Sequence, residues 1–300
     1  MINHTYTALI TPFKDNKIDE ESLRKLIEYQ IEGGVDGIVA CGTTGESPTL
    51  SHEEHKTMIK LCVEISNKRI KVMAGTGSNS TSEAIMMTNY AKKIGADSCL
   101  IVAPYYNKPT SQGIYEHFKE INNIGLPIIL YNIPGRSVIN ISDDEISKIA
   151  KLTNVIGVKD ATADLARIAT LRKLITKENF MYLSGEDLTA LGFNAMGGNG
   201  IISVTANIAP QLIKKLQNLC ANFKYQEALE LQDQLTILHQ AMFCETNPIP
   251  VKYAASYLGI SSNEIRLPLC SPSKTNIIKI NNIIDKFKLI QFGSYKLINK

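Results

Sequence analysis

The sequence has no tryptophan, and aromatic residues make up only 7% of its 300 positions. It has no apolar run that approaches the roughly 20 residues needed to cross a bilayer as a helix. Residues 1–5 lack the basic start and the apolar stretch of a signal peptide. We therefore expect neither membrane insertion nor secretion, and the localisation that we predict is cytoplasmic.

An excess of one charge is also missing. The chain carries 32 Lys and Arg against 29 Asp and Glu, a formal net charge of +3. Such a balance gives no reason to expect nucleic acid or a membrane surface as a partner. With 44% hydrophobic and 20% charged residues, the composition is that of a globular protein that can bury a large core.

The cysteines show no spacing that is typical of a metal site or of a disulfide framework. No CxxC pair and no Cys/His ligand pattern occurs among Cys41, Cys62, Cys99, Cys220, Cys244 and Cys270. We expect reduced thiols and no metal site. Neither a GxGxxG dinucleotide fingerprint nor a GxxxxGK[ST] phosphate loop is present.

What the sequence does contain is a regular alternation of short strand-like runs with helical segments. The runs are apolar throughout, as expected for parallel strands that are covered on both faces. The eight candidates are residues 6–10, 37–40, 70–74, 98–102, 128–131, 155–158, 181–184 and 200–204.

Helix-start chemistry lies between these runs. Ser51, Ser80 and Ser142 are each followed three residues later by Glu, which is the pattern of a capping box. Eight strand–helix units favour a closed (β/α)8 TIM barrel. The strand pattern ends near residue 206, and residues 226–241 and 250–258 look helical. We predict a single catalytic domain, with the barrel core in residues 1–206 and the last barrel helix and a C-terminal helical extension in residues 207–300.

Catalytic groups of such barrels lie where the strands end. Lys159 ends the sixth run, at the mouth of an apolar barrel, where desolvation favours the neutral amine that attacks a carbonyl. The alternative is a lysine that merely pairs with Asp160. Tyr131 ends the fifth run and could move protons beside an imine, although a tyrosine there could also be a packed residue.

Other polar groups at the same edge allow two interpretations. Thr43 and Thr44 lie between glycines, where they could bind a carboxylate or simply form a tight turn. Arg136 could bind a second carboxylate or be solvated. Asp187, beside Glu186, is placed to cap a helix. The glycines at 197 and 198 precede the eighth run and Gly200 begins it, so all three lie at the end of the barrel away from catalysis.

Taken together, these motifs resemble the 4-hydroxy-tetrahydrodipicolinate synthase (dihydrodipicolinate synthase) family, within the pyruvate-dependent class I aldolase and N-acetylneuraminate lyase superfamily. The resemblance extends from about residue 5 to about residue 268. It rests on residues 8–13, 42–46, 104–107, 131–136, 157–160, 202–207 and 247–252.

The resemblance implies a lyase that joins pyruvate to L-aspartate 4-semialdehyde, the committed step of lysine biosynthesis through diaminopimelate, without a cofactor. Lys159 would form the Schiff base and Tyr131 would shuttle protons. The remaining implied residues are Thr43 as a relay to Tyr106 of a neighbouring subunit, Thr44 for the pyruvate carboxylate, Arg136 for the semialdehyde carboxylate, the carbonyl of Ile202 near the lysine, and Gly185 among the substrate-binding residues. A homotetramer built as a pair of dimers is implied as well.

A second set of residues resembles the lysine-binding site of feedback-inhibited members of this family. The set comprises Pro48, His52, His55, Asn79, Glu83 and Tyr105. We expect allosteric inhibition by L-lysine at a subunit interface, although each residue alone could be an ordinary surface or capping residue.

Three alternatives stay open at this point. Some synthase-like barrels act on other aldehydes or dehydrate sugar acids, so a related pyruvate-dependent aldolase, lyase or dehydratase is the second candidate. A barrel that binds a keto acid as a sensor would be expected to lack the lysine, the tyrosine or the arginine, and none is missing. A phosphate- or flavin-binding barrel is disfavoured because no glycine-rich loop follows the seventh or eighth run.

Overall fold

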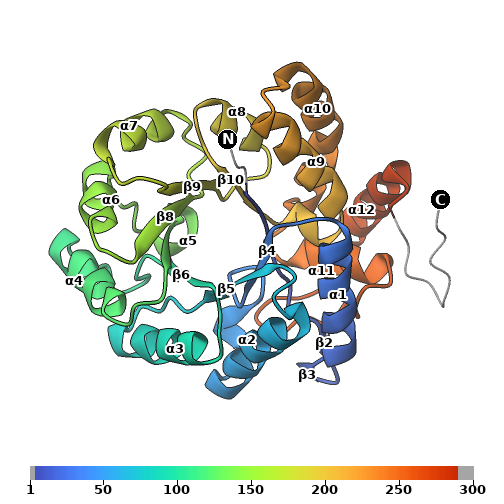
Figure 1. Cartoon of the computed structure of the whole chain (residues 1–300). Helices are drawn as coiled ribbons and strands as arrows, with labels where there is room; N and C mark the ends of the chain where they lie inside the picture. Colours follow the sequence, from blue (N-terminus) through green and yellow to red (C-terminus); the bar gives the residue numbers. More distant parts are fainter. Residues whose placement is uncertain (1–3, 290–300) are drawn as a thin grey trace.

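The computed structural model describes residues 4–289, which form a closed barrel of eight parallel strands. The first barrel strand pairs with the next barrel strand along the chain and also with the last one, which closes the sheet (Figure 1). The strands are β1 (His4–Ala8), β4 (Gly37–Ala40), β5 (Lys71–Gly75), β6 (Ser98–Val102), β7 (Ile128–Asn132), β8 (Val155–Asp160), β9 (Met181–Ser184) and β10 (Gly200–Ser203). The predicted (β/α)8 TIM barrel is confirmed.

All eight predicted runs become barrel strands, and β4, β6 and β9 have the predicted bounds. A hairpin of β2 (Phe13–Lys14) and β3 (Lys17–Ile18) was not predicted. Its turn residues, Asp15 and Asn16, have positive φ angles of 53° and 59°. Asp and Asn tolerate this left-handed conformation better than other non-glycine residues, which explains the turn.

Helices surround the barrel as an outer ring (Figure 1). In chain order they are α1 (Glu20–Glu32), α2 (His52–Ser66), α3 (Thr81–Lys93), α4 (Ser111–Asn122), α5 (Pro134–Ser137), α6 (Asp143–Ala150), α7 (Ala166–Leu174), α8 (Ala190–Ala195), α9 (Pro210–Ala221), α10 (Tyr225–Met242), α11 (Ile249–Tyr257) and α12 (Lys274–Phe287), with 3-10 turns η1 (Ser47–Thr49) and η2 (Thr205–Asn207). The helices predicted over residues 226–241 and 250–258 correspond to α10 and α11.

Two of the three predicted capping boxes form. Ser51 and Ser142 each exchange hydrogen bonds with the glutamate three residues later. The box predicted at Ser80 is wrong, because Ser80 makes no side-chain cap bond and Glu83 turns to other partners. The capping role predicted for Asp187 is also wrong, since its carboxylate accepts hydrogen bonds from Ser203 and from residues 204 and 205 instead.

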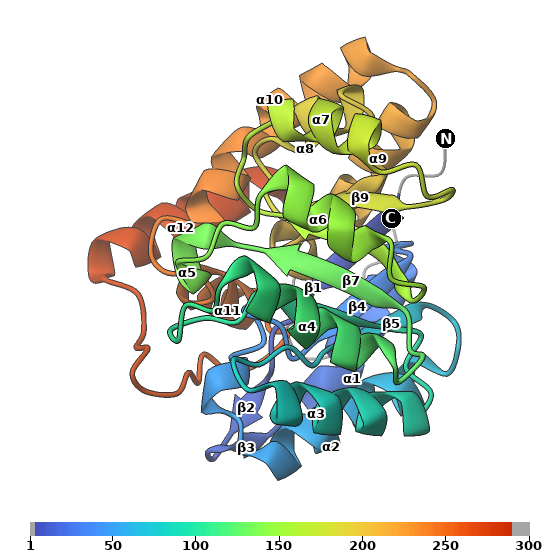
Figure 2. The same ribbon diagram turned by 90° about the vertical axis from the view of Figure 1, so that its left-hand side faces the viewer.

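The last two helices, α11 and α12, lie at one end of the barrel. In the side view, α11 and α12 lie at the same end as α5, which directly follows β7 (Figure 2). This is therefore the end at which the barrel strands finish. The sequence after Phe287 is basic, and residues 290–300 lie outside the described part of the chain.

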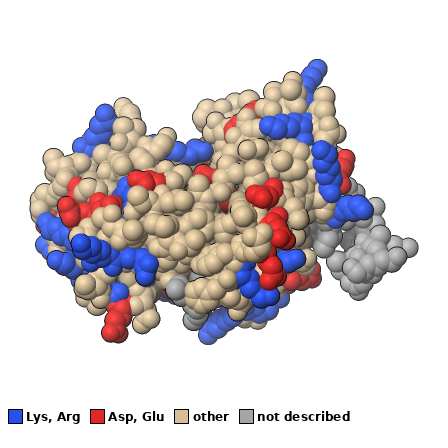
Figure 3. Space-filling model, turned by 90° about the horizontal axis from the view of Figure 1, so that it is seen from above, with Lys and Arg blue, Asp and Glu red and all other residues tan. Residues whose placement is uncertain are grey.

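The surface and the thiols agree with the composition. Lys and Arg are interspersed with Asp and Glu on the face shown in Figure 3. All six cysteines lie within the described residues and are free thiols. Among residues 4–289, no helix combines the length and apolar character required to cross a membrane.

Candidate active site

Lys159 and Tyr131 lie side by side where β8 and β7 end. The two residues are in register across the parallel pair. The Lys159 Nζ atom is 4.1 Å from the centroid of the Tyr131 ring, and each residue is only 5% exposed. The predicted amine and the predicted phenol are therefore neighbours in a largely dehydrated space.

Gly185, directly after β9, packs closely against the aliphatic part of the Lys159 side chain. A Cβ atom added at Gly185 would lie 3.1 Å from Lys159 Cε and 2.7 Å from Ala161 Cβ. The backbone N–H of Gly185 donates to the carbonyl of Asp160 over 2.7 Å. Any larger residue at 185 would press on the lysine. Ile202 lies buried on β10.

The turn formed by residues 42–46 follows β4 and contributes the two threonines. Thr43 lines a cavity of about 40 Å³ together with Tyr131. It also lines an adjoining cavity of about 200 Å³ that contains Arg136. Thr44 is buried, and its hydroxyl accepts a hydrogen bond of 3.0 Å from the side-chain amide of Asn247. Thr43 thus connects the tyrosine with the arginine.

Arg136 lies on α5 and is exposed. Its Nη2 donates to the backbone carbonyl of Asn247 over 2.8 Å. Asn247 therefore contacts both Thr44 and Arg136, and its buried Oδ1 has no hydrogen-bond partner among the described residues. Sequence reasoning gave Asn247 no role, because its partners are 203 and 111 positions away. Its place in the 247–252 motif was the only signal.

Tyr106 is the predicted residue that lies apart from the others. Its side chain is 88% exposed, and it lines neither of the two cavities that contain Thr43. Its backbone has a positive φ of 71°. The neighbouring Tyr105 instead lines the larger cavity with Arg136.

The second predicted set is partly held together by Glu83. One oxygen of Glu83 contacts His52 Nε2 at 2.7 Å, and the other accepts from the Ser78 hydroxyl at 2.6 Å. The hydrogen bond from Ser78, aided by His52, lowers the pKa of Glu83. Burial, aided by the charge of Glu83, raises the pKa of Tyr105.

The rest of this set lies around Glu83. His55 Nε2 contacts the carbonyl of Gly75 at 2.7 Å, and burial lowers the pKa of His55. The carbonyl of Asn79 accepts from the Asn107 side chain at 2.8 Å. Pro48 lines the same cavity as Thr43 and Arg136. The second set therefore shares a cavity wall with the first.

A buried ion pair anchors the 42–46 turn from below. Lys252 Nζ lies 2.5 Å from Glu46 Oε1, and both side chains are 0% exposed. Burial lowers the pKa of Lys252, while Glu46 opposes that shift. The other oxygen of Glu46 accepts from the backbone N–H of Arg266 over 3.1 Å. This pair was not predicted, since the two residues are 206 positions apart.

Among residues 4–289, no group of three or more His, Cys, Asp or Glu side chains is placed to hold a metal ion. The groups that these strand ends and loops bring together are an amine, a phenol, hydroxyl groups and a guanidinium. An amine beside a phenol can condense with a ketone, and the guanidinium can bind a carboxylate.

Comparison with known proteins places this arrangement among its relatives. A family model described as the dihydrodipicolinate synthetase family matches residues 1–287. A 4-hydroxy-tetrahydrodipicolinate synthase from Parvibaculum lavamentivorans is 54% identical over 274 residues, which cover 91% of this chain and 94% of that protein.

Solved structures agree over nearly the whole chain. The chloride-inhibited dihydrodipicolinate synthase of Acinetobacter baumannii, in complex with pyruvate, is 43% identical with a TM-score of 0.93, covering 97% of this chain and all of that one (100%). The dihydrodipicolinate synthase of Cyanidioschyzon merolae with lysine bound is 34% identical with a TM-score of 0.91, covering 95% of this chain and 97% of that one.

Proposed function

This chain belongs to the dihydrodipicolinate synthetase family, and we propose that it condenses pyruvate with L-aspartate 4-semialdehyde through a Schiff base on Lys159. The product is 4-hydroxy-tetrahydrodipicolinate, and the step commits its substrates to lysine biosynthesis through diaminopimelate. The observation that supports the assignment of Lys159 most strongly is its buried amine, 4.1 Å from the Tyr131 ring.

The chemistry begins with attack of neutral Lys159 Nζ on the keto carbon of pyruvate. Loss of water leaves an imine. Once it is protonated, the imine withdraws electrons more strongly than the ketone did. A proton then leaves the methyl group to give an enamine, whose carbon attacks the aldehyde of the second substrate. Finally the amino group of that substrate attacks the imine carbon and releases Lys159.

The proposed supporting roles follow from the chemistry of each group. Tyr131 gives and takes the protons of the imine steps, with Thr43 as its relay towards Tyr106 of a neighbouring subunit. Thr44 binds the pyruvate carboxylate, and Arg136 binds the carboxylate of the semialdehyde. The carbonyl of Ile202 and the space above Gly185 complete the pocket around the lysine.

Trapping of the imine tests the assignment. Wild-type protein incubated with pyruvate and borohydride is expected to gain the mass of one reduced pyruvate per chain, and Lys159→Ala is expected to gain none. A matched control is Lys177→Ala, because the Lys177 ammonium contacts backbone carbonyls of residues 152, 153 and 155 instead of Tyr131. This variant should keep the adduct.

An assay with L-aspartate 4-semialdehyde separates the alternatives. Consumption of the semialdehyde by wild type supports the proposed substrate. An adduct without this activity keeps the Schiff-base lyase and favours another aldehyde or a sugar acid as substrate. Folded wild-type protein without any adduct would overturn the proposal in favour of a barrel that only binds a keto acid.

We further propose that the working unit is at least a dimer and that the assembly is a tetramer of two dimers. The exposed side chain of Tyr106 supports this proposal, because a relay residue that lies outside its own cavity needs a second chain to be useful. Sedimentation at micromolar concentration should give the tetramer. Tyr106→Phe should lower kcat while pyruvate trapping on Lys159 persists.

We also propose that L-lysine inhibits the enzyme by binding the set formed by Pro48, His52, His55, Asn79, Glu83 and Tyr105. Glu83 offers a carboxylate for an ammonium group, and His52 adds a polar contact at the same place. The lysine-bound relative from Cyanidioschyzon merolae supports the choice of ligand. Pro48 and Tyr105 also line the cavity of Arg136, which provides a route from inhibitor to substrate.

Glu83→Thr tests this regulatory proposal. The variant should need on the order of tenfold more lysine for half inhibition, because an ion-paired contact to the ligand is lost. Glu53→Thr is the matched control, since Glu53 pairs with Lys56 on the exposed side of the same region. Unchanged inhibition in Glu83→Thr would show that L-lysine does not bind at this set of residues.

A further inference from the structure

A polar network covers the outer face of the two strands that carry Tyr131 and Lys159. Each of these residues is followed by a buried polar one, Asn132 on β7 and Asp160 on β8, and these two are also in register. Because successive side chains of a strand point to opposite faces, Asn132 and Asp160 face away from the cavity. The Asn132 amide donates to Asp160 Oδ2 over 3.2 Å.

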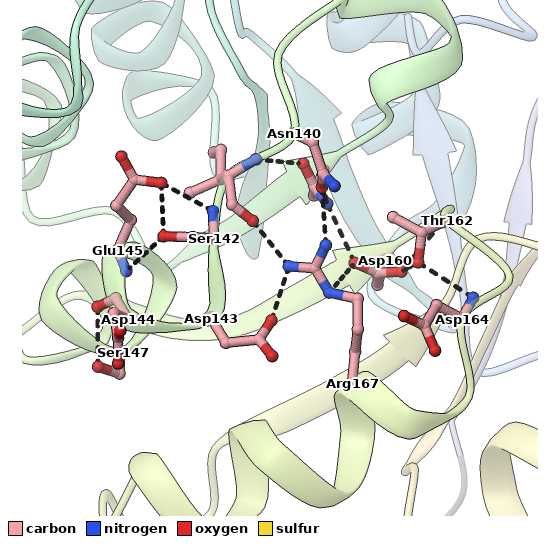
Figure 4. Close-up of polar contacts among 12 residues, drawn as sticks. Asn140, Ser142, Asp143, Asp144, Glu145, Ser147, Asp160, Thr162, Asp164 and Arg167 are labelled. Atoms are coloured by element: carbon pink, nitrogen blue, oxygen red, sulfur yellow. Dashed lines mark hydrogen bonds and ion pairs between the residues drawn. The ribbon is translucent and has the colours of Figure 1, made fainter.

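Arg167, on α7, is the centre of this network (Figure 4). Its Nη1 donates to Asn140 Oδ1 over 2.7 Å, and its Nη2 donates to the carbonyl of Ile141 over 2.7 Å. Nη2 also lies 2.9 Å from Asp143, and Nε lies 3.6 Å from Asp160 Oδ2. The guanidinium thereby joins the segment after β7 to the end of β8.

Asp160 is bound from both sides. Its Oδ1 accepts from the backbone N–H of Thr162 over 3.0 Å and also from the Thr162 hydroxyl. Asn132 in turn accepts from the backbone N–H of Ile141 over 3.1 Å. The segments that follow β7 and β8 are therefore tied to each other directly behind the reactive side chains.

The burial of this network makes its charges consequential. The side chains of Arg167 and Asp160 are only 9% and 3% exposed, and Asp143 is 25% exposed. A buried guanidinium with two carboxylates stays favourable only while its partners are in place. Lys159 directly precedes Asp160 in the chain, so these charges lie close to the Lys159 amine.

We propose that the Arg167–Asp160 pair positions Lys159, holding the end of β8 against β7 and balancing the charge behind the Schiff-base amine. The inference rests on the proposed function of Lys159 and deepens it. Arg167 and Asp160 touch neither substrate nor reacting atoms in this scheme, so they are positioning residues. Titratable groups next to β8 include Tyr131 on β7, Tyr182 on β9, Glu186 just after β9 and the residues of α6 from Asp143 on. Lys177 contacts the carbonyl of Val155 at the far end of the strand.

The charge balance gives a readout that a purely structural role would not move. Arg167→Met leaves the Asp160 carboxylate uncompensated, which stabilises the ammonium form of Lys159 and moves imine formation to higher pH. Asp160→Asn removes the negative charge behind Lys159 while Arg167 keeps Asp143 as its partner, and it moves imine formation to lower pH. The two single variants are expected to shift the midpoint of the pH profile in opposite directions, each by about half a pH unit or more.

The experiment is the rate of borohydride-trapped pyruvate adduct against pH, together with kcat and KM. Each single variant is expected to form the imine about tenfold more slowly at the wild-type optimum, since small misplacements of a reacting group are costly. The KM for the semialdehyde should change by less than about twofold, because Arg136 is untouched. The double variant should regain the wild-type midpoint.

Controls separate positioning from loss of structure. Lys214→Met and Asp36→Asn break a different ion pair, in which Lys214 Nζ lies 2.7 Å from the carboxylate of Asp36, the residue that precedes β4. These variants should keep the wild-type midpoint. If Arg167→Met does not fold, Arg167→Lys keeps the charge and loses the fork, and it should slow imine formation without moving the midpoint.

Two results would overturn the inference. One is a wild-type pH midpoint and rate in both single variants, and the other is a shift of both midpoints in the same direction. In either case the wild-type adduct would still stand and only the positioning role would fail. Absence of an adduct in wild type would instead remove the proposed function itself.

Discussion

Two polar clusters flank the 42–46 turn and differ in how they meet water. The base cluster consists of Glu46, Lys252, Arg266 and Phe13, and its ion pair is 0% exposed at both ends. The rim cluster consists of His52, Ser78, Glu83 and Tyr105, and its His52–Glu83 contact is 58% and 36% exposed at its two ends. A buried ion pair thus holds the turn from below, and a polar contact that reaches water borders it from the side.

The difference teaches what each cluster is suited to do. In the base cluster, Lys252 Nζ and the Arg266 guanidinium lie 4.3 and 4.2 Å from the centroid of the Phe13 ring. The Lys252–Glu46 pair is closed off from water, so these two charges have no solvent partner to exchange with. Breaking such a buried pair leaves an uncompensated charge. An exposed pair contributes little stability and can exchange its partner for a ligand. The base cluster therefore fixes the turn, and the rim cluster is free to respond.

The first way to break this comparison is Lys252→Met, for which we expect the largest effect. The variant leaves the Glu46 carboxylate buried and unpaired, which should lower the free energy of unfolding by about 3–5 kcal/mol. Urea unfolding measures this change. The double variant Glu46→Gln, Lys252→Met should be less damaged than Lys252→Met alone, because no buried charge is left behind. A loss below about 1 kcal/mol would show that water reaches the base cluster.

The base cluster also marks where sequence reasoning ends. The strands could be predicted because β4, β6 and β9 are local apolar runs bounded by turns, a pattern that needs no knowledge of partners. Glu46 and Lys252 are 206 positions apart, so no local pattern relates them. The available signals were a charged residue inside the otherwise uncharged α11 and the place of the two residues in the 42–46 and 247–252 motifs.

Two local motifs misled for the same physical reason. Glu83 completes a capping box in the sequence, but Ser78 and His52 compete for its carboxylate once the barrel closes. Asp187 has the right spacing to cap a helix, yet the Ser203 hydroxyl and the backbone beyond β10 donate to its carboxylate instead. The positions of Lys159 and Tyr131 at neighbouring strand ends could be expected from the sequence, because the apolar strands themselves fix where they end.

The second prediction concerns Glu54, which joins the base cluster to α2. Its side chain accepts from Arg266 over 2.6 and 2.9 Å, and this hydrogen-bonded pair lowers the pKa of Glu54 to about 2. A depressed carboxyl pKa contributes stability above the unfolded value, and the contribution disappears as the pH falls towards the folded value. With a discount for partial exposure, we expect about 2 kcal/mol, lost between about pH 5 and pH 2.

Unfolding of wild type and Glu54→Gln across that range measures the contribution. The difference between the two proteins should be largest near pH 7 and should shrink towards zero near pH 2. All other carboxylates titrate in both proteins, so their contributions cancel in the difference. A difference that stays constant over the whole range would mean that the Glu54 charge contributes nothing to stability.

The third prediction concerns Asn247, which bridges Thr44 and Arg136 at the edge of the base cluster. Asn247→Ala removes the amide that donates to the Thr44 hydroxyl and leaves the backbone carbonyl that accepts from Arg136. Loss of one buried hydrogen bond corresponds to about 1 kcal/mol, so the KM for pyruvate should rise about fivefold. The KM for the semialdehyde should change less. Steady-state kinetics with each substrate varied separates the two, and equal increases would contradict the division of roles between Thr44 and Arg136.

The smallest expected effect on stability belongs to His52→Ala in the rim cluster. The His52–Glu83 contact is short, at 2.7 Å, but both side chains reach water, so its loss should lower the free energy of unfolding by less than about 0.5 kcal/mol. The same variant should weaken inhibition by L-lysine several-fold, because Glu83 loses the neighbour that orients it. Urea unfolding and lysine titrations on one preparation measure both quantities. If His52→Ala instead lost about 2 kcal/mol or more, the rim cluster would be a structural element like the base cluster. The distinction between a fixed base and a responsive rim would then fail, since the exposed pair would hold the turn as firmly as the buried one.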